Sequence, residues 1–174
     1  MIAQSLLKKD PNDAIPAPRI CGTYTSLSTA KAVAHRAIFD AGYLRECFTE
    51  FDVREADIPE AKRGKGLAVY AVSNDGTESQ VSIATIPNLN GFDGGNDDRL
   101  QGELWHVVQV SVDYERDESG EARETNVKGT FRTFAEAWKA AKECLLNDED
   151  GIKKASYADY IEAAQGEGIL MRKM

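Results

Sequence analysis

The sequence is poor in the residues that usually carry metal and thiol chemistry. It holds two histidines and three cysteines, and none of them stands in a CxxC, HxxxH or HxxE spacing. Zinc sites are normally built from such closely spaced ligands, and three scattered thiols do not form the disulfide framework of a small secreted protein. We therefore expect no metal and no cofactor, and a cytoplasmic or nuclear protein rather than a secreted one.

Long apolar runs and an excess of positive charge are also missing. No segment approaches the ~18 apolar residues of a membrane-spanning helix, and the first nine residues lack the basic and apolar regions of a signal peptide. The formal net charge is -8 and the pI is about 4.9. An acidic surface opposes binding to nucleic acid and to anionic membranes. The composition favours a soluble protein that binds neither, and whose partner is another protein or a second copy of itself.

The first half of the chain predicts a tail followed by mixed strands and helices. Residues 1–18 contain an Asp-Pro-Asn-Asp segment and two further prolines, so we expect a flexible N-terminal tail there. Apolar spacing of three and four residues predicts helices, the second of them from Phe48 and Phe51. Turn residues at 74–77 between two Val-rich segments predict a hairpin. In order, we expect a strand, a helix, a shorter helix and two hairpin strands at 19–24, 28–40, 43–53, 67–73 and 81–85.

The second half begins after a Gly-, Asn- and Asp-rich stretch at 88–102, which we expect to be a flexible connecting loop. A long alternating segment then predicts a strand. Thr133 and Glu136 have the spacing of a capping box at the start of a helix. In order, we expect two strands, two helices and a last strand at 104–114, 125–131, 134–146, 152–164 and 168–171.

One segment of the chain occurs twice. Residues 22–27 lie over 129–134 without a gap, and each copy begins with Gly-Thr-aromatic. Small residues then match along the following helix, Ala30 with Ala137 and Ala34 with Ala141. We therefore predict an α+β fold with an internally duplicated strand–helix–short helix–hairpin unit, a mainly antiparallel sheet and helices packed on one side. The expected parts, within one compact domain, are a first repeat at 19–87, a connecting loop at 88–102 and a second repeat at 103–174.

The same features resemble a known group of proteins. Gly-Thr-aromatic, a Ser/Thr-capped Ala-rich helix, a short helix with paired aromatics and a hairpin are similar to uncharacterised duplicated proteins of filamentous fungi, over residues 19–174. The resemblance implies the duplicated α+β fold and no particular activity.

Comparison of the two copies separates scaffold residues from unusual ones, because a scaffold position should keep its character in both. Trp138 stands where the first copy has Lys31, a position expected toward solvent, and Trp105 falls on the more polar face of its strand, close to Val107. Tryptophan on an otherwise polar surface is typical of interfaces, so Trp105, Trp138 and Val107 form the predicted binding surface. The alternative, that the second helix packs against more structure than the first, stays open.

The sequence predicts a non-enzymatic binding or protein-interaction module without catalytic residues, and two alternatives stay open. One is a small-molecule-binding protein or enzyme with a cleft between the repeats, whose candidate residues are His106, Tyr114, Tyr70 and Glu103. The other is an acidic inhibitor that covers a basic partner surface. His106 shares its strand face with valines, which favours a partly buried, hydrogen-bonded histidine. Cys21 is the thiol expected to be most exposed.

Overall fold

The computed structural model of the chain describes residues 2–7, 18–54, 66–112, 123–146, 151–157, 160–165 and 168–173, with side-chain detail at 18–54, 66–111, 124–146 and 151–157. The protein belongs to the α+β class and pairs its strands in antiparallel fashion, as predicted from the sequence. It divides into a first unit, Met1–Gln101 with Ser111–Thr125, and a second unit, Gly102–Val110 with Asn126–Met174. Among the helices of the described residues, none has the length and apolar composition to cross a membrane.

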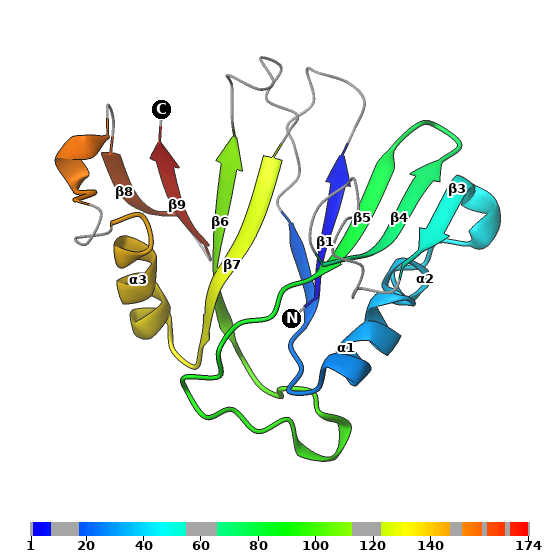
Figure 1. Cartoon of the computed structure of the whole chain (residues 1–174), viewed down its shortest axis with the longest axis horizontal. Helices are drawn as coiled ribbons and strands as arrows, with labels where there is room; N and C mark the ends of the chain where they lie inside the picture. Colours follow the sequence, from blue (N-terminus) through cyan, green and yellow to red (C-terminus); the bar gives the residue numbers. More distant parts are fainter. Residues whose placement is uncertain are drawn as a thin grey trace. The chain divides into compact units, whose positions relative to one another are not determined.

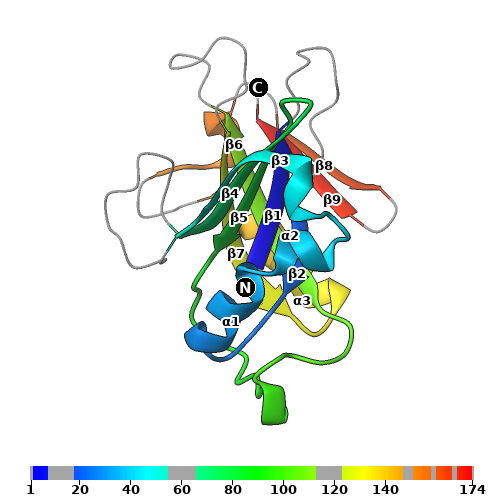
Figure 2. The ribbon, with the colours of Figure 1, turned by 90° about the vertical axis from the view of Figure 1, so that its right-hand side faces the viewer.

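Where the structure describes the first unit, it combines a five-stranded antiparallel sheet with two short helices. Its strands are β1 (Ile2–Leu7), β2 (Arg19–Gly22), β3 (Phe48–Val53), β4 (Leu67–Ser73) and β5 (Glu78–Ile83). Its helices are α1 (Leu27–Ala34) and α2 (Ala37–Asp40), and a 3-10 turn, η1 (Arg45–Cys47), precedes β3. The strand order is β2-β1-β5-β4-β3, and Figure 2 shows this unit from the side of α1 and α2.

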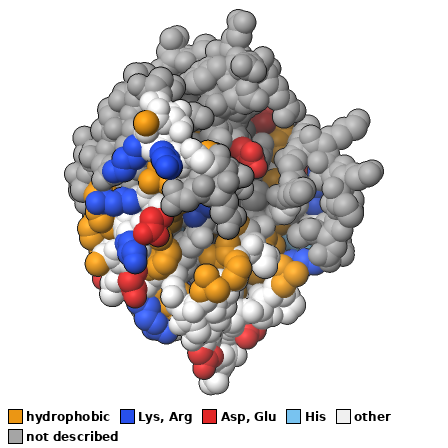
Figure 3. All heavy atoms as spheres, turned by 60° about the vertical axis from the view of Figure 1, so that its left-hand side comes forward, with side chains coloured by type: hydrophobic (Ala, Val, Ile, Leu, Met, Phe, Trp, Pro, Cys, Tyr) orange, Lys and Arg blue, Asp and Glu red, His pale blue; other side chains and the backbone are white. Residues whose placement is uncertain are grey.

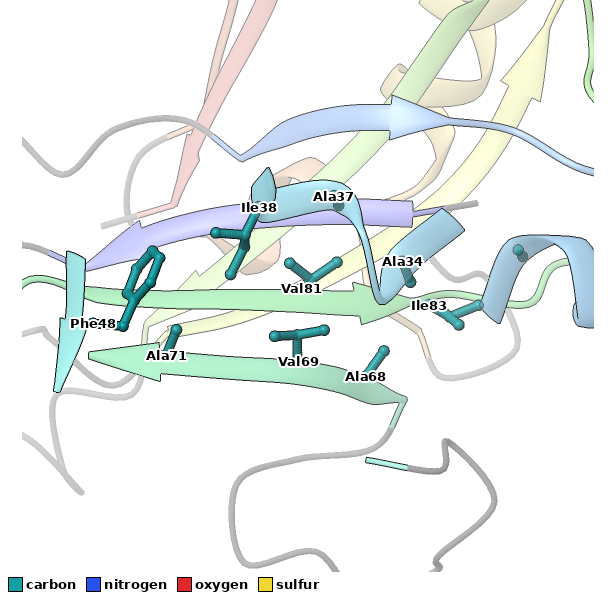
Figure 4. Packing of buried hydrophobic residues seen from close by; sticks show 10 residues of the cluster. Ala34, Ala37, Ile38, Phe48, Ala68, Val69, Ala71, Val81 and Ile83 are labelled. Carbon is teal, nitrogen blue, oxygen red and sulfur yellow. The ribbon is translucent and has the colours of Figure 1, made fainter. Parts of the chain in front are cut away.

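Small apolar side chains hold the helices of the first unit against its sheet. Ala34 and Ile38 come from the helices and meet Val69 and Val81 of the two central hairpin strands (Figure 4). All four side chains are fully buried. Burying a Val or Ile side chain contributes about 1.5–3 kcal/mol, so this cluster stabilises the packing of the helices on the sheet. The single helix expected at 28–40 is interrupted by a turn between α1 and α2.

The expected flexible tail is wrong for its first residues. β1 lies between β2 and β5, and its register with β5 runs from Ile2 opposite Ile83 to Leu7 opposite Glu78. Two neighbouring strands supply hydrogen-bond partners for the backbone on both edges of β1. These partners come from residues that are distant in the sequence. The local sequence of residues 2–7 therefore does not indicate a strand. Residues 8–17 of the expected tail lie outside the described residues.

The short helix expected at 43–53 is also wrong, because Phe48 and Phe51 belong to strand β3. Phe48 lies opposite Ser73 and Phe51 opposite Ala71, with a register shift in between. A bulge adds one residue to a strand and restores both rings to the same face despite their three-residue spacing. The two ring centroids are 5.7 Å apart. A spacing typical of a helix therefore arises here from a bulged strand.

In its described residues, the second unit contains two strand pairs and one helix. Its strands are β6 (Trp105–Val112), β7 (Arg123–Phe131), β8 (Tyr160–Gln165) and β9 (Gly168–Lys173), of which β6 adjoins β7 and β8 adjoins β9 (Figure 1). Helix α3 (Phe134–Glu143) is capped by the predicted capping box of Thr133 and Glu136. The helix expected at 152–164 is wrong, because a 3-10 turn, η3 (Lys154–Ser156), and strand β8 occupy this part of the chain.

Both units contain the order strand, helix, 3-10 turn, strand and strand, beginning at β2 in the first unit and at β7 in the second; the first unit differs in dividing the helix into α1 and α2 and in adding β5. Each starts with a glycine covered by an aromatic ring. A Cβ atom added to Gly22 would lie 2.8 Å from the ring of Tyr24, and one added to Gly129 would lie 2.6 Å from the ring of Phe131. Only glycine lets these rings lie flat on their strands. The internal duplication itself stays a prediction.

Candidate binding surface

Helix α3 carries a stripe of large side chains on one of its faces. Phe134, Trp138 and Lys142 follow each other at four-residue intervals, which places them one above the other on a helix. The capping box fixes the first turn, because Glu136 N donates to Thr133 Oγ1 at 3.3 Å and Thr133 N donates to the Glu136 carboxylate at 3.1 Å. A cap of this kind contributes about 0.5–2 kcal/mol. The start of the stripe is therefore held firmly.

Three aromatic rings of the second unit lie in consecutive contact, and we call Trp105, Phe134 and Trp138 the aromatic cluster. The rings of Trp105 and Phe134 meet edge to face with centroids 5.1 Å apart. Those of Phe134 and Trp138 stack with centroids 6.0 Å apart and planes inclined by 22°. Phe134 is 39% exposed, and both tryptophans are half-buried. The cluster thus combines rigid mutual packing with ring surface that faces solvent.

The structure brings together the two tryptophans that the sequence singled out, through a residue that the sequence reasoning missed. Phe134 is the link, and its four-residue spacing from Trp138 was the available signal. Val107, the third predicted surface residue, is only 6% exposed. It packs with Ala137 and Ala141 in the core of the second unit, because β6 turns the face that carries Trp105 and Val107 toward α3. A direct role of Val107 in a binding surface is therefore wrong.

One lysine contacts the aromatic cluster, and two further basic residues are close to it in the sequence. The Lys142 ammonium lies 5.0 Å from the centroid of the Trp138 ring, within the range of a cation–π interaction. Lys139 is exposed on the same helix, and Arg132 is exposed just before its N-cap. Figure 3 views the side of the molecule that carries α3, where hydrophobic side chains lie among charged ones. The Glu136 carboxylate accepts hydrogen bonds inside the capping box, so its charge is directed to the helix start.

Three of the four residues of the enzyme alternative have described side chains. His106 Nδ1 lies 3.1 Å from Thr130 Oγ1, and burial lowers the pKa of His106. This confirms the prediction of a partly buried, hydrogen-bonded histidine. Tyr70 is buried in β4 of the first unit, and Glu103 is exposed before β6. Tyr114 lies outside the described residues.

The 88–102 connection is an ordered, hydrogen-bonded loop in place of the flexible connector that its composition suggested. Asp98 adopts a left-handed backbone with φ of 56°. Its carboxylate accepts a hydrogen bond from Thr29 Oγ1 at 2.8 Å, and its carbonyl oxygen accepts one from Thr25 N at 2.8 Å. A carboxylate is favourable at a helix N-terminus, so Asp98 ties the connection to the start of α1. This explains the loop by structure alone, without a ligand.

The Cys21 thiol, expected to be the most exposed of the three, is instead half-buried against the core of the first unit. Burial raises the pKa of Cys21, while Arg19 opposes the shift. Cys144 packs against the core of the second unit, and burial raises its pKa as well. A raised pKa disfavours the thiolate form of both residues.

Comparisons of the chain with protein-family models, with curated proteins and with solved structures find no match.

Proposed function

We propose that this protein is a non-enzymatic binding module that engages a protein partner through the aromatic cluster. The observation that carries the proposal is the consecutive contact of Trp105, Phe134 and Trp138 on a rigidly capped helix, with ring surface left exposed. Tryptophan is enriched among the residues that dominate binding energy, because it removes a large area from water at a small entropic cost.

The matching helix of the first unit, α1, lacks the aromatic side chains of α3, and this difference supports the proposal. Ser26 caps α1 as Thr133 caps α3, so Leu27 and Phe134 are each the first residue of their helix. One turn further on, α1 carries Lys31 where α3 carries Trp138. Packing of a helix on a sheet therefore does not require aromatic side chains at these positions. Their presence in α3 favours a role in binding.

The test compares partner capture by the full chain and by four variants, after circular dichroism has shown that each variant is folded. We expect Trp138→Ala and Phe134→Ala each to weaken capture of the same partner by about 30-fold or more, which corresponds to the loss of ~2 kcal/mol typical of a central interface residue. The matched changes in the first unit, Lys31→Ala and Leu27→Ala, should leave capture unchanged. If both changes in α3 retain every partner and the self-association of the wild type, the proposed surface is wrong.

Location in a reducing compartment and kinship with the duplicated fungal proteins belong to the same proposal. In support of the first, all three cysteines are described and none of them forms a disulfide bond. In support of the second, the glycine–aromatic pairs and capped helices recur in both units.

A further inference from the structure

The sheets of the two units differ by one strand. In each unit a strand pair, β1 with β2 or β6 with β7, is followed by helix, 3-10 turn and a second strand pair, β3 with β4 or β8 with β9. The first unit then adds β5, which lies between β1 and β4 and pairs with both in antiparallel fashion. Among the described residues of the second unit no strand takes this place, because β6 has only β7, and β9 only β8, as a hydrogen-bonded neighbour.

The directions of β6 and β9 match those of the two strands that β5 joins. Because β5 is antiparallel to β1 and to β4, these two strands run in the same direction. Figure 1 shows that β6 and β9 also run in the same direction as each other. One strand antiparallel to both would complete the order β7-β6-x-β9-β8, the counterpart of β2-β1-β5-β4-β3 in the first unit.

The burial of side chains after the helices gives an independent indication of the missing strand. In the first unit, Ile38 is fully buried and meets Val81 of β5 (Figure 4). Leu145 is the counterpart of Ile38 when the helices are aligned at their N-caps, and it is only half-buried. An apolar side chain at this position is therefore less covered in the unit that lacks a counterpart of β5.

We propose that the second unit binds an extended segment of a partner protein, which enters between β6 and β9 as an antiparallel strand and takes the place that β5 fills in the first unit. Strand addition of this kind gains affinity from main-chain hydrogen bonds and specificity from alternate side chains. The site is a pair of sheet edges and not the exposed aromatic rings, so this inference goes beyond the proposed function.

Strand β5 defines the chemistry of the segment. Burial alternates along its six residues, and Ser79, Val81 and Ile83 are the buried ones. The expected segment has the same length, with apolar, β-branched side chains at alternate positions that pack toward α3 and polar side chains between them. A second copy of this chain does not offer such a strand, because β5 is already paired on both sides. The donor is therefore a different protein.

A synthetic peptide with the sequence of residues 77–84 serves as the probe. We expect it to bind the full chain and to slow hydrogen exchange of amides in β6 and β9, while exchange in β1 and β4 stays unchanged. The same peptide with N-methyl groups at alternate residues keeps every side chain and loses main-chain donors, so it should bind at least tenfold more weakly. A peptide with Val81→Ser and Ile83→Ser should bind at least tenfold more weakly as well.

A variant that carries its own additional strand provides the decisive comparison. A copy of residues 74–83 joined after Met174 supplies the turn and the strand that follow β4 in the first unit. Amides of β6 and β9 should exchange at least tenfold more slowly in this variant, and its affinity for the peptide should fall at least tenfold. The matched extension that carries Val81→Ser and Ile83→Ser in the copy should change neither quantity.

The outcomes decide between strand addition and its alternatives. Equal binding of the N-methylated peptide, protection of β1 and β4 in place of β6 and β9, or no protection of β6 and β9 by either the peptide or the extension would each overturn the proposal. A dimer of the wild type in which β6 and β9 are already protected would make the occupant a second copy and overturn the partner. Trp138→Ala should bind the peptide as tightly as the wild type, so this proposal and the proposed function fail separately.

Discussion

Individual polar residues of this protein act mainly by closing turns and helix ends. Asp98 joins the 88–102 connection to α1, Glu136 closes the cap of α3, and Asp75 organises the turn between β4 and β5. In the last case, Asp75 Oδ1 accepts hydrogen bonds from Ser73 Oγ and, at 2.9 Å, from Thr77 N. The sequence predicted this turn from its Asn-Asp-Gly-Thr composition, and the structure confirms the hairpin.

Replacement of Asp75 by asparagine should change how stability depends on pH. The hydrogen bond from Ser73, followed by those from Thr77, lowers the pKa of Asp75 from 3.8 to about 2. Because the folded pKa lies below the unfolded one, the carboxylate stabilises the fold above about pH 4, and this contribution is lost as the pH falls toward 2. Melting temperatures measured from pH 7 to pH 2 should show a deficit for Asp75→Asn at high pH that disappears near pH 2.

The exposed Glu103 offers a control for this experiment. Glu103→Gln should melt in parallel with the wild type over the same range. Parallel curves for Asp75→Asn and the wild type would show that the turn does not depend on the charge of Asp75.

At the scale of elements, glycines at strand and helix ends allow backbone shapes that other residues resist. Gly66, just before β4, has φ of 77°, and a Cβ atom there would lie 2.4 Å from the carbonyl oxygen of Ile83. Gly42, after α2, has φ of 95°, but a Cβ atom there would meet no atom within 4 Å. A side chain at either position would be strained by the positive φ. Only at Gly66 would it also clash with a neighbouring backbone atom.

Replacing each of these glycines by alanine distinguishes the cost of the backbone strain from the cost of the steric clash. Gly42→Ala should lower the free energy of unfolding by about 1–2 kcal/mol, the cost of a left-handed residue with a Cβ atom. Gly66→Ala should cost more, by roughly 1–3 kcal/mol, because a backbone atom of β5 must move. Urea denaturation measures both. Equal losses of unfolding free energy in the two variants would mean that the backbone around Gly66 and Ile83 moves to accept the Cβ atom without cost.

At the scale of the whole molecule, each unit has its own core. In the first unit the core includes Val69 and Val81, and in the second it centres on Val107, Ala137 and Ala141. Both tryptophans belong to the second unit, so their emission reports on that unit alone. Hydrogen exchange of amides in β4 and β5 reports on the first.

A core change in the first unit should therefore appear mainly in that unit. Val69→Ala removes fully buried side-chain atoms and should lower the unfolding free energy measured by hydrogen exchange in β4 and β5 by about 2 kcal/mol. The midpoint measured by tryptophan emission should stay unchanged. The matched Val53→Ala, at a side chain that is 47% exposed, should affect neither probe. An equal shift in both probes for Val69→Ala would show that the chain unfolds as one cooperative unit.

The sequence by itself determined the class of the fold, the hairpin of β4 and β5 and the cap of α3. These features depend on local chemistry, namely turn residues, N-cap hydroxyls and periodicity, that is readable within a few positions. Tertiary structure alone decided that Ile2–Leu7 is a strand, that Phe48 and Phe51 lie in a bulged strand, and that residues 160–165 form β8. In each of these cases the backbone finds its hydrogen-bond partners in a distant part of the chain. Burial of Val107 and the contact of both tryptophans with Phe134 likewise required the packing of α3 against β6, which no local pattern encodes.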